Sequence, residues 1–224
     1  MRIDKLLSNL KYGTRNEIKK AMKQGLLEVN GELVKDPKTN VTPESDKIVF
    51  MNEEIYYKNP IFLMLNKPQG YVCANKDGLH KTVFELIEEP YNRFDLKIAG
   101  RLDLDTEGLL LLTNDGDLIH SIINPKKDIY KKYFVRVNEG FDCSLLTGNM
   151  EILDGRNNPY KPLPAIVERV SDTEFYLSIK EGKFHQVKRM CKFHNREVVY
   201  LKRVAVGDIE LDPSLQLGAY KEVF

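Results

Sequence analysis

The sequence predicts an α+β protein, in which a small module containing a pair of helices is followed by a mainly antiparallel β-sheet domain with flanking helices. Apolar residues recur at helical spacing in the first 24 residues, whereas alternating patterns and short apolar runs typical of strands dominate after residue 60. A Lys-Asn-Pro linker at residues 58–60 separates the two parts. Of the 224 residues, 42% are hydrophobic, which is enough to bury a core. We therefore expect domains at residues 1–58 and 59–224.

The first module is expected to contain two short helices. Apolar residues at helical spacing predict the first helix: Ile3, Leu6, Leu7 and Leu10. Gly13 is placed to end it. Thr14 and Glu17 form a capping-box pattern at the start of the second helix, and Gly25 can end that helix. Its expected apolar face consists of Ile18, Ala21 and Met22.

A β-hairpin is expected directly after these helices. The dipeptide Asn30-Gly31 separates the short runs 27–29 and 32–34, and this is the strongest local hairpin signal in the chain. Residues near 36–58 then supply turns and a strand.

The second domain opens with the apolar run 61–65 and a turn at residues 68–70. Alternation and apolar content predict strands at residues 109–113, 133–137, 165–170, 174–179 and 198–206. A helix is expected over residues 83–89, because Thr82 and Glu85 form another capping-box pattern. A last helix is expected where apolar residues recur at helical spacing on a packed face: Phe184, Val187, Met190 and Cys191.

Composition excludes several classes of protein. No apolar run approaches the roughly 18 residues of a membrane span, and the N-terminus lacks the apolar run of a signal peptide, so we expect a cytoplasmic protein. The three cysteines form no pair typical of zinc sites or disulfide frameworks, and the histidines show no metal-ligand spacing with them. Walker and dinucleotide patterns are missing. We expect neither a metal nor a nucleotide cofactor.

The net charge of +1 hides local excesses of opposite sign. Residues 1–24, 126–136 and 188–196 are basic, whereas residues 85–117 are acidic. Basic clusters that folding brings together can form a track for phosphates, although such runs are more often solvated faces. Charge alone does not decide between these two interpretations.

The densest group of candidate functional residues lies at positions 100–116, where polar residues stand directly before an apolar strand. A buried strand that presents a polar loop is a common way to build a site. The carboxylates of Asp103 and Asp105 are compatible with magnesium binding, with acid/base hydrolysis or with a plain turn before a core strand. Their spacing does not choose among these.

The first quarter of the chain resembles the S4 RNA-binding fold. The resemblance runs from Arg2-Ile3-Asp4-Lys5-Leu6-Leu7 to Val29-Asn30-Gly31. In that family the paired helices lie against structured RNA, which implies phosphate contacts by Arg2, Lys5, Arg15, Lys19, Lys20 and Lys23. A solvated helical face is the alternative.

Three ordered blocks resemble the pseudouridine synthases: Gly100-Arg101-Leu102-Asp103 followed by Asp105-Thr106, Gly108 and a leucine run; Lys132-Tyr133-Phe134-Val135; and Glu181-Gly182-Lys183-Phe184-His185-Gln186-Val187-Lys188-Arg189-Met190. The third block is most similar to the branch that acts on small-subunit ribosomal RNA. The resemblance implies that Asp103 is the catalytic carboxylate, that Tyr133 stacks on the base or holds the aspartate, and that Lys188 supplies the partner cation. Many relatives have arginine at this last position, and lysine lacks its bidentate geometry.

The same resemblance implies RNA contacts by Arg101, His185, Gln186 and Arg189, and a reaction that uses no cofactor. The expected partner is small-subunit (16S) ribosomal RNA, alone or in an assembling ribonucleoprotein, and the protein is expected to be a monomer without membrane contact. Two alternatives stay open. One is a ribosome assembly factor that keeps the fold without the chemistry, and the other is a metal-dependent phosphodiesterase that uses Asp103 and Asp105.

Overall fold

The computed structural model describes residues 1–123 and 128–223, which form two compact units. Unit 1 comprises Met1–Ile61 and Ile87–Leu96, and unit 2 comprises Phe62–Leu86 and Lys97–Phe224. The predicted division into domains 1–58 and 59–224 stays a prediction. The structure adds that a short segment from the middle of the chain packs with the N-terminal residues. Lys126 and Lys127 of the second basic segment lie outside the described residues.

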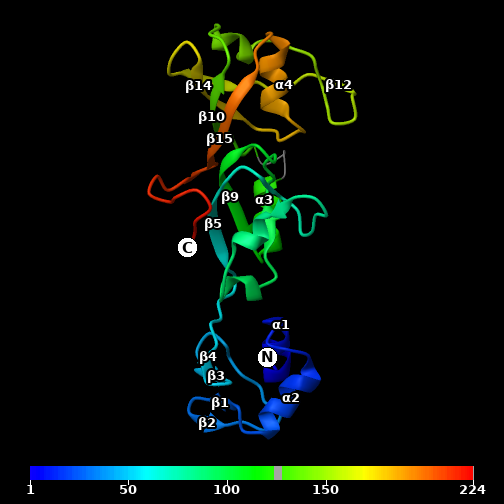
Figure 1. The fold of residues 1–224 in the computed structure, drawn as a ribbon, viewed down its shortest axis with the longest axis vertical. Coiled ribbons are helices and arrows are strands. Elements are labelled where there is room, and N and C mark those ends of the chain that lie inside the picture. The colour runs from blue at the N-terminus through cyan, green and yellow to red at the C-terminus, as the bar shows by residue number, and fades with distance from the viewer. Residues whose placement is uncertain (124–127, 224) are drawn as a thin grey trace. The chain divides into compact units, whose positions relative to one another are not determined.

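Unit 1 combines two helices with a small antiparallel sheet (Figure 1). Its elements are α1 (Ile3–Asn9), α2 (Arg15–Lys23), β1 (Leu27–Val29), β2 (Glu32–Leu33), β3 (Ile48–Phe50), β4 (Glu53–Glu54) and the 3₁₀ turn η2 (Tyr91–Arg93). The strand order is β2-β1-β3-β4. The predicted hairpin is confirmed, because Asn30 and Gly31 both have positive φ, as a tight two-residue turn requires.

The capping box of α2 is confirmed. The Thr14 hydroxyl accepts a hydrogen bond from the Glu17 amide, and the Glu17 carboxylate accepts one from the Thr14 amide at 2.7 Å. The prediction that Gly13 ends α1 is wrong, because the helix already ends at Asn9 and Lys11 takes the left-handed conformation with φ 60°. The Lys11 ammonium donates to the carbonyl oxygens of Asn92 and Phe94.

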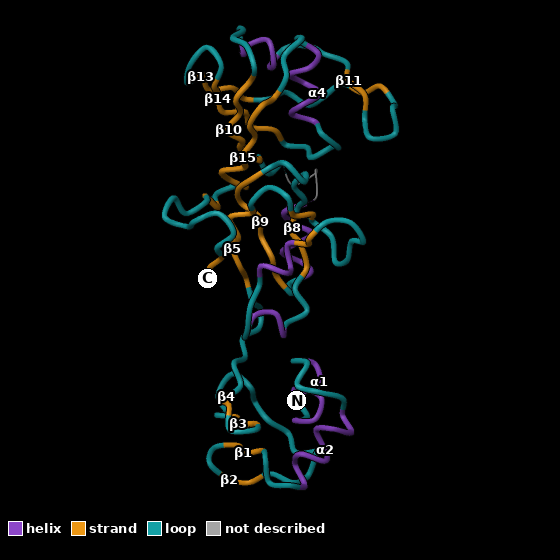
Figure 2. Tube along the Cα trace, in the orientation of Figure 1, coloured by secondary structure: helices purple, strands orange, loops and turns teal. Residues whose placement is uncertain are grey.

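Unit 2 is built on a large mixed sheet, with the order β13-β14-β10-β15-β9-β5-β17 (Figures 1 and 2). Its strands are β5 (Phe62–Lys67), β6 (Tyr71–Val72), β7 (Lys81–Thr82), β8 (Lys97–Ala99), β9 (Glu107–Thr113), β10 (Lys131–Val137), β11 (Ile152–Leu153), β12 (Pro159–Tyr160), β13 (Ile166–Arg169), β14 (Glu174–Ile179), β15 (Val198–Val206), β16 (Ile209–Glu210) and β17 (Tyr220–Glu222). Its helical elements are α3 (Gly116–Ile123), α4 (Gln186–Phe193), η1 (Val83–Leu86) and η4 (Cys143–Thr147).

The pairing in this sheet is mainly antiparallel, as predicted, except where β9 meets β15 in parallel. At that junction a Cβ on Gly108 would lie 2.2 Å from the Arg203 carbonyl oxygen, so only glycine fits. Glycine at position 108 therefore lets β9 approach β15 directly after the polar loop.

One core of this unit lies where β5, β8 and β9 pack against α3.

The prediction of a helix over residues 83–89 is wrong, because the structure has only a 3₁₀ turn over Val83–Leu86. The Glu85 carboxylate still accepts a hydrogen bond from the Thr82 amide at 2.7 Å, which is half of the expected capping box. Residues Ile87–Leu96 belong to unit 1, and Pro90 disfavours helical backbone in the residue before it. A regular helix therefore does not extend past the turn.

The helix in the third motif block is confirmed, but its expected boundary and packed face are partly wrong. Helix α4 begins at Gln186, and its buried side chains include Val187 and Met190. Phe184 lies before the helix with 54% of its surface exposed. Periodicity failed there because His185 takes the left-handed conformation and changes the chain direction. No helix within residues 1–123 and 128–223 is long and apolar enough to cross a membrane.

Candidate active site

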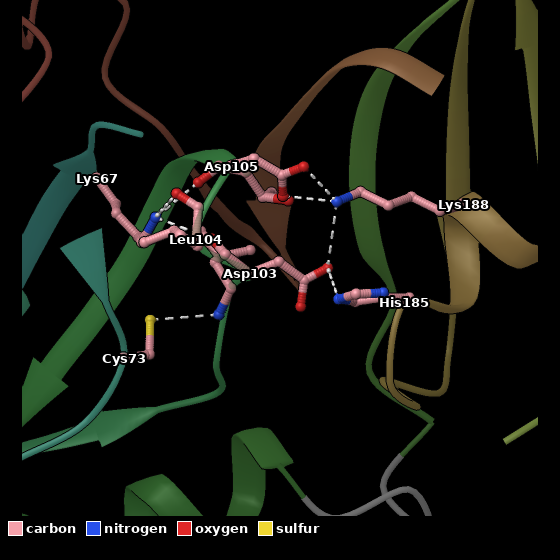
Figure 3. Close-up of polar contacts among 9 residues, drawn as sticks. Lys67, Cys73, Asp103, Leu104, Asp105, His185 and Lys188 are labelled. Atoms are coloured by element: carbon pink, nitrogen blue, oxygen red, sulfur yellow. Dashed lines mark hydrogen bonds and ion pairs between the residues drawn. The ribbon is translucent and has the colours of Figure 1, made fainter. Parts of the chain in front are cut away.

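The loop between β8 and β9 forms one wall of a cavity of about 370 Å³ within unit 2. Asp103 from this loop, Tyr133 from β10 and Lys188 from α4 all line the cavity. Figure 3 shows the side chains of Lys188 and His185 extending toward Asp103. The three residues that the motif blocks single out, which are far apart in sequence, therefore meet in one cavity.

The Lys188 ammonium lies between two carboxylates. Its Nζ is 3.8 Å from Oδ2 of Asp103, and it donates hydrogen bonds of 2.5 and 2.7 Å to the two carboxylate oxygens of Asp105 (Figure 3). His185 adds a second nitrogen near Asp103, with Nε2 at 3.6 Å from Oδ2. Burial raises the pKa of Asp105, but the hydrogen bond and charge of Lys188 outweigh it and leave this pKa below its ordinary value.

Lys67, at the end of β5, stabilises the Asp103 loop through hydrogen bonds to its backbone. Its side chain is completely buried, and its ammonium donates to the carbonyl oxygens of four residues at 2.8 to 3.4 Å: Pro68, Asp103, Leu104 and Thr106. Desolvation lowers the pKa of this lysine. A buried cation needs such partners, so the loop carbonyls and Lys67 fix each other.

Arg203, in β15, holds the other side of the loop. Only 2% of this residue is exposed, and its guanidinium donates to the carbonyl oxygens of Gly100, Arg101 and Leu109 at 2.8 to 3.3 Å. The sequence motifs point to neither Arg203 nor Lys67. A signal was available for Arg203, because it falls on the same face of a predicted strand as Leu201 and Ala205. A charged residue on an apolar face indicates a buried cation with polar partners.

His185 and Phe184 form a stacked pair at the wall of the same cavity. Their ring centroids are 3.8 Å apart and the planes differ by 18°. The backbone of His185 is left-handed, with φ 52° and ψ 30°, a conformation that costs about 1 kcal/mol or more for a residue with a side chain.

The predicted RNA contacts of the third block differ in their surroundings. The Gln186 side chain is buried. Its carbonyl oxygen accepts a hydrogen bond from the Lys183 backbone amide, and its amide nitrogen donates one to the Glu181 carboxylate. Gln186 therefore stabilises the chain that leads into α4. Arg189 donates to the carbonyl oxygens of Leu153 and Asp154. Arg101 is exposed and lines the cavity. RNA contact by these side chains and by His185 stays a prediction.

The predicted RNA contacts of unit 1 lie on or next to its two helices. Arg2 donates to both carboxylate oxygens of the buried Asp4, at 2.8 and 3.0 Å. Burial raises the pKa of Asp4, but the hydrogen bond and charge of Arg2, together with the charge of Arg15, outweigh it and lower this pKa. The remaining candidates are Lys5 on α1 and Lys19, Lys20 and Lys23 on α2, all exposed except Lys19, which is half-buried.

Comparison with known proteins identifies the family. Residues 61–193 match the RNA pseudouridylate synthase family, and residues 1–48 match the S4 domain. The chain is 44% identical over its full length to an uncharacterized RNA pseudouridine synthase of Bacillus subtilis (strain 168), of which it covers 95%. It is 39% identical to the ribosomal small subunit pseudouridine synthase A of Haemophilus influenzae, over 99% of this chain and 95% of that protein.

Structural comparison agrees with this result. A crystal structure of a pseudouridylate synthase, 36% identical in sequence, aligns over 100% of this chain and 96% of its own with a TM-score of 0.68. The chain therefore belongs to the RNA pseudouridylate synthase family and carries an N-terminal S4 domain. Both resemblances found in the sequence are confirmed.

Proposed function

We propose that this enzyme converts a specific uridine of small-subunit ribosomal RNA into pseudouridine, with Asp103 as the catalytic carboxylate. The observation that carries the proposal is the meeting of Asp103, Lys188 and Tyr133 in one cavity, with 3.8 Å between Oδ2 of Asp103 and Nζ of Lys188. The name of the H. influenzae relative supports the choice of small-subunit ribosomal RNA. The S4 domain supports an RNA substrate of folded structure.

The reaction suits a carboxylate. Isomerisation breaks the bond between C1′ and N1, turns the uracil and joins C5 to C1′, while one proton leaves C5 and another is taken up at N1. No electrons are gained or lost overall, so the proposed reaction needs no redox cofactor. A carboxylate can act covalently on the sugar or base, or assist proton removal. Lys188 balances the charge of Asp103 in a cavity from which the substrate displaces water.

The uridine must leave its helix before it can reach this cavity, because C1′ and C5 are inaccessible in a stacked helix. Extrusion costs a few kcal/mol. Stacking on Tyr133 and phosphate contacts by Arg101 and Arg189 offset this cost in the proposed complex. The exposed cations of unit 1 add affinity for the surrounding RNA.

Mapping pseudouridine in ribosomal RNA from cells with and without this gene tests the proposal. We expect one small-subunit pseudouridine to disappear without the gene, to return with the wild-type gene and to stay absent with Asp103→Asn. A missing site in large-subunit RNA would contradict the proposed substrate. If the protein binds ribosomal RNA but the pseudouridine content is unchanged in cells without the gene, an assembly factor would be favoured.

A further inference from the structure

We propose that Phe184 and His185 form a ring ledge, which binds the base of a nucleotide adjacent to the extruded uridine by stacking on the face of the Phe184 ring that His185 does not cover. The inference rests on the proposed function, because it assumes that a uridine leaves the RNA stack and enters the cavity beside Asp103. It adds a second base-binding position, distinct from that of Tyr133.

The position of Phe184 separates it from an ordinary exposed apolar residue. Isolated exposed apolar side chains are common and need no explanation. Phe184, however, lines the same cavity as Asp103, and 54% of its surface is exposed. Phe193, at the end of α4, is exposed to a similar extent (49%) but does not line that cavity. An exposed ring at this place is available to the RNA strand that delivers the uridine.

The ring of Phe184 is held in place before any RNA binds. It stacks on His185 at 3.8 Å, and the Arg189 guanidinium carbon lies 5.4 Å from its centroid. A Cβ on Gly155 would lie 3.0 Å from Cβ of Phe184, so the loop between β11 and β12 packs against the base of this side chain. Such preorganisation lowers the entropic cost of stacking a ligand on the ring.

The charges around the ledge fit a nucleic acid strand. Four cationic residues lie close to the ledge in sequence, on the chain leading into α4 and on the helix itself: Lys183, Lys188, Arg189 and Lys192. Lys188 is paired with Asp105 and Arg189 donates to two backbone carbonyl oxygens, whereas Lys183 and Lys192 are exposed. Aromatic rings that alternate with cations are the usual composition of sites for single-stranded nucleic acid, in which the rings stack on bases and the cations contact phosphates. Extrusion of one uridine also removes a stacking partner from its neighbour. The neighbouring base then gains from a protein ring of fixed orientation.

Stacking on a neighbouring base is expected in both the ground state and the transition state, so its loss should raise KM and leave kcat nearly unchanged. We expect Phe184→Leu, which keeps apolar bulk without a ring, to raise KM for the RNA about tenfold, the effect of losing one stacked base. Phe184→Tyr should behave like the wild type. Phe193→Leu is the matched control and should leave KM unchanged.

A double-mutant cycle with the RNA identifies the contact directly. The probe is a hairpin fragment of small-subunit ribosomal RNA that carries the mapped uridine, with an abasic ribose directly before or directly after it. Dissociation constants are measured by fluorescence anisotropy in the Asp103→Asn background, which prevents turnover. At one of the two positions, removal of the base should weaken binding about tenfold with Phe184 but have almost no effect with Phe184→Leu.

Additive effects at both abasic positions, or equal KM values for Phe184→Leu and the wild type, would overturn the ring ledge. If the wild type modifies its RNA in the same experiments, only this inference fails and the proposed function stands. If the wild type leaves every uridine unchanged, the proposed function fails and the ledge with it.

Discussion

Lys20 and Lys23 on α2 of unit 1 expose their side chains, whereas Lys67 and Arg203 of unit 2 are almost completely buried. Lys20 and Lys23 lie on the helix surface, where water solvates their charge. Lys67 instead donates to four backbone carbonyl oxygens around the Asp103 loop. The two units thus contain chemically similar side chains in opposite environments.

A count of basic residues in the sequence therefore combines cations that have two different roles. An exposed cation stays available to a phosphate and contributes little to folding. A buried cation is expensive unless polar groups surround it, so its removal leaves those groups without partners. Mutations in unit 1 are therefore expected to change RNA affinity, and mutations of the buried cations to change the stability and geometry of the catalytic loop.

The largest expected effect comes from Lys67→Met. Because the carbonyl oxygens of the loop lose their buried donor, we expect the free energy of unfolding to fall by about 3 kcal/mol. Urea denaturation measures this change. Lys23→Met on the exposed face of α2 is the control and should stay within about 0.5 kcal/mol of the wild type. Equal losses for the two variants would break the distinction between buried and exposed cations.

A smaller effect is expected from neutralising the three lysines of α2 together. The triple variant Lys19→Gln, Lys20→Gln and Lys23→Gln should bind small-subunit ribosomal RNA about 10- to 100-fold more weakly at physiological salt, because three phosphate contacts are lost. The slope of log affinity against log salt should decrease in magnitude by about 2 to 3. Filter binding at several salt concentrations checks both numbers. An unchanged slope would show that the basic face of α2 does not contact phosphates.

The smallest effect concerns Asp105. Its pKa in the folded protein is lowered from an ordinary value of 3.8, so its pair with Lys188 stabilises the fold fully above that value and progressively less as the pH falls below it. The carboxylate is 62% exposed, and solvent screening limits this contribution to about 1 kcal/mol or less. The stability difference between the wild type and Asp105→Asn, measured by urea denaturation, should therefore be constant above about pH 5 and shrink below pH 4. A difference that grows in acid would contradict the assignment.

Much of the fold could be predicted from the sequence because its signals are local. The capping box of Thr14 and Glu17, the Asn30-Gly31 turn and the alternation over Glu174–Ile179 each act through neighbouring residues. Phe184 was misplaced for a tertiary reason. It has the right spacing for a helix, but the left-handed His185 between it and α4 turns the chain, and nothing in the local pattern shows this.

The candidate site could be predicted only in part. Motif resemblance pointed to Asp103, Tyr133 and Lys188, and the structure brings these residues to one cavity. Motif resemblance did not reveal that the Lys188 ammonium lies closer to Asp105 than to Asp103, because pairing distances depend on how α4 packs. The role of Lys67 was equally hidden, since its partners are backbone carbonyl oxygens, which any sequence supplies.

The most direct test of the account compares the two carboxylates that face Lys188. Single-turnover release of tritium from small-subunit ribosomal RNA labelled with [5-³H]uridine is measured for Asp103→Asn and Asp105→Asn. We predict that Asp103→Asn abolishes release, whereas Asp105→Asn stays within about tenfold of the wild type, because Lys188 can still pair with Asp103. Activity that persists in Asp103→Asn, or that is lost equally in both variants, would contradict Asp103 as the catalytic carboxylate.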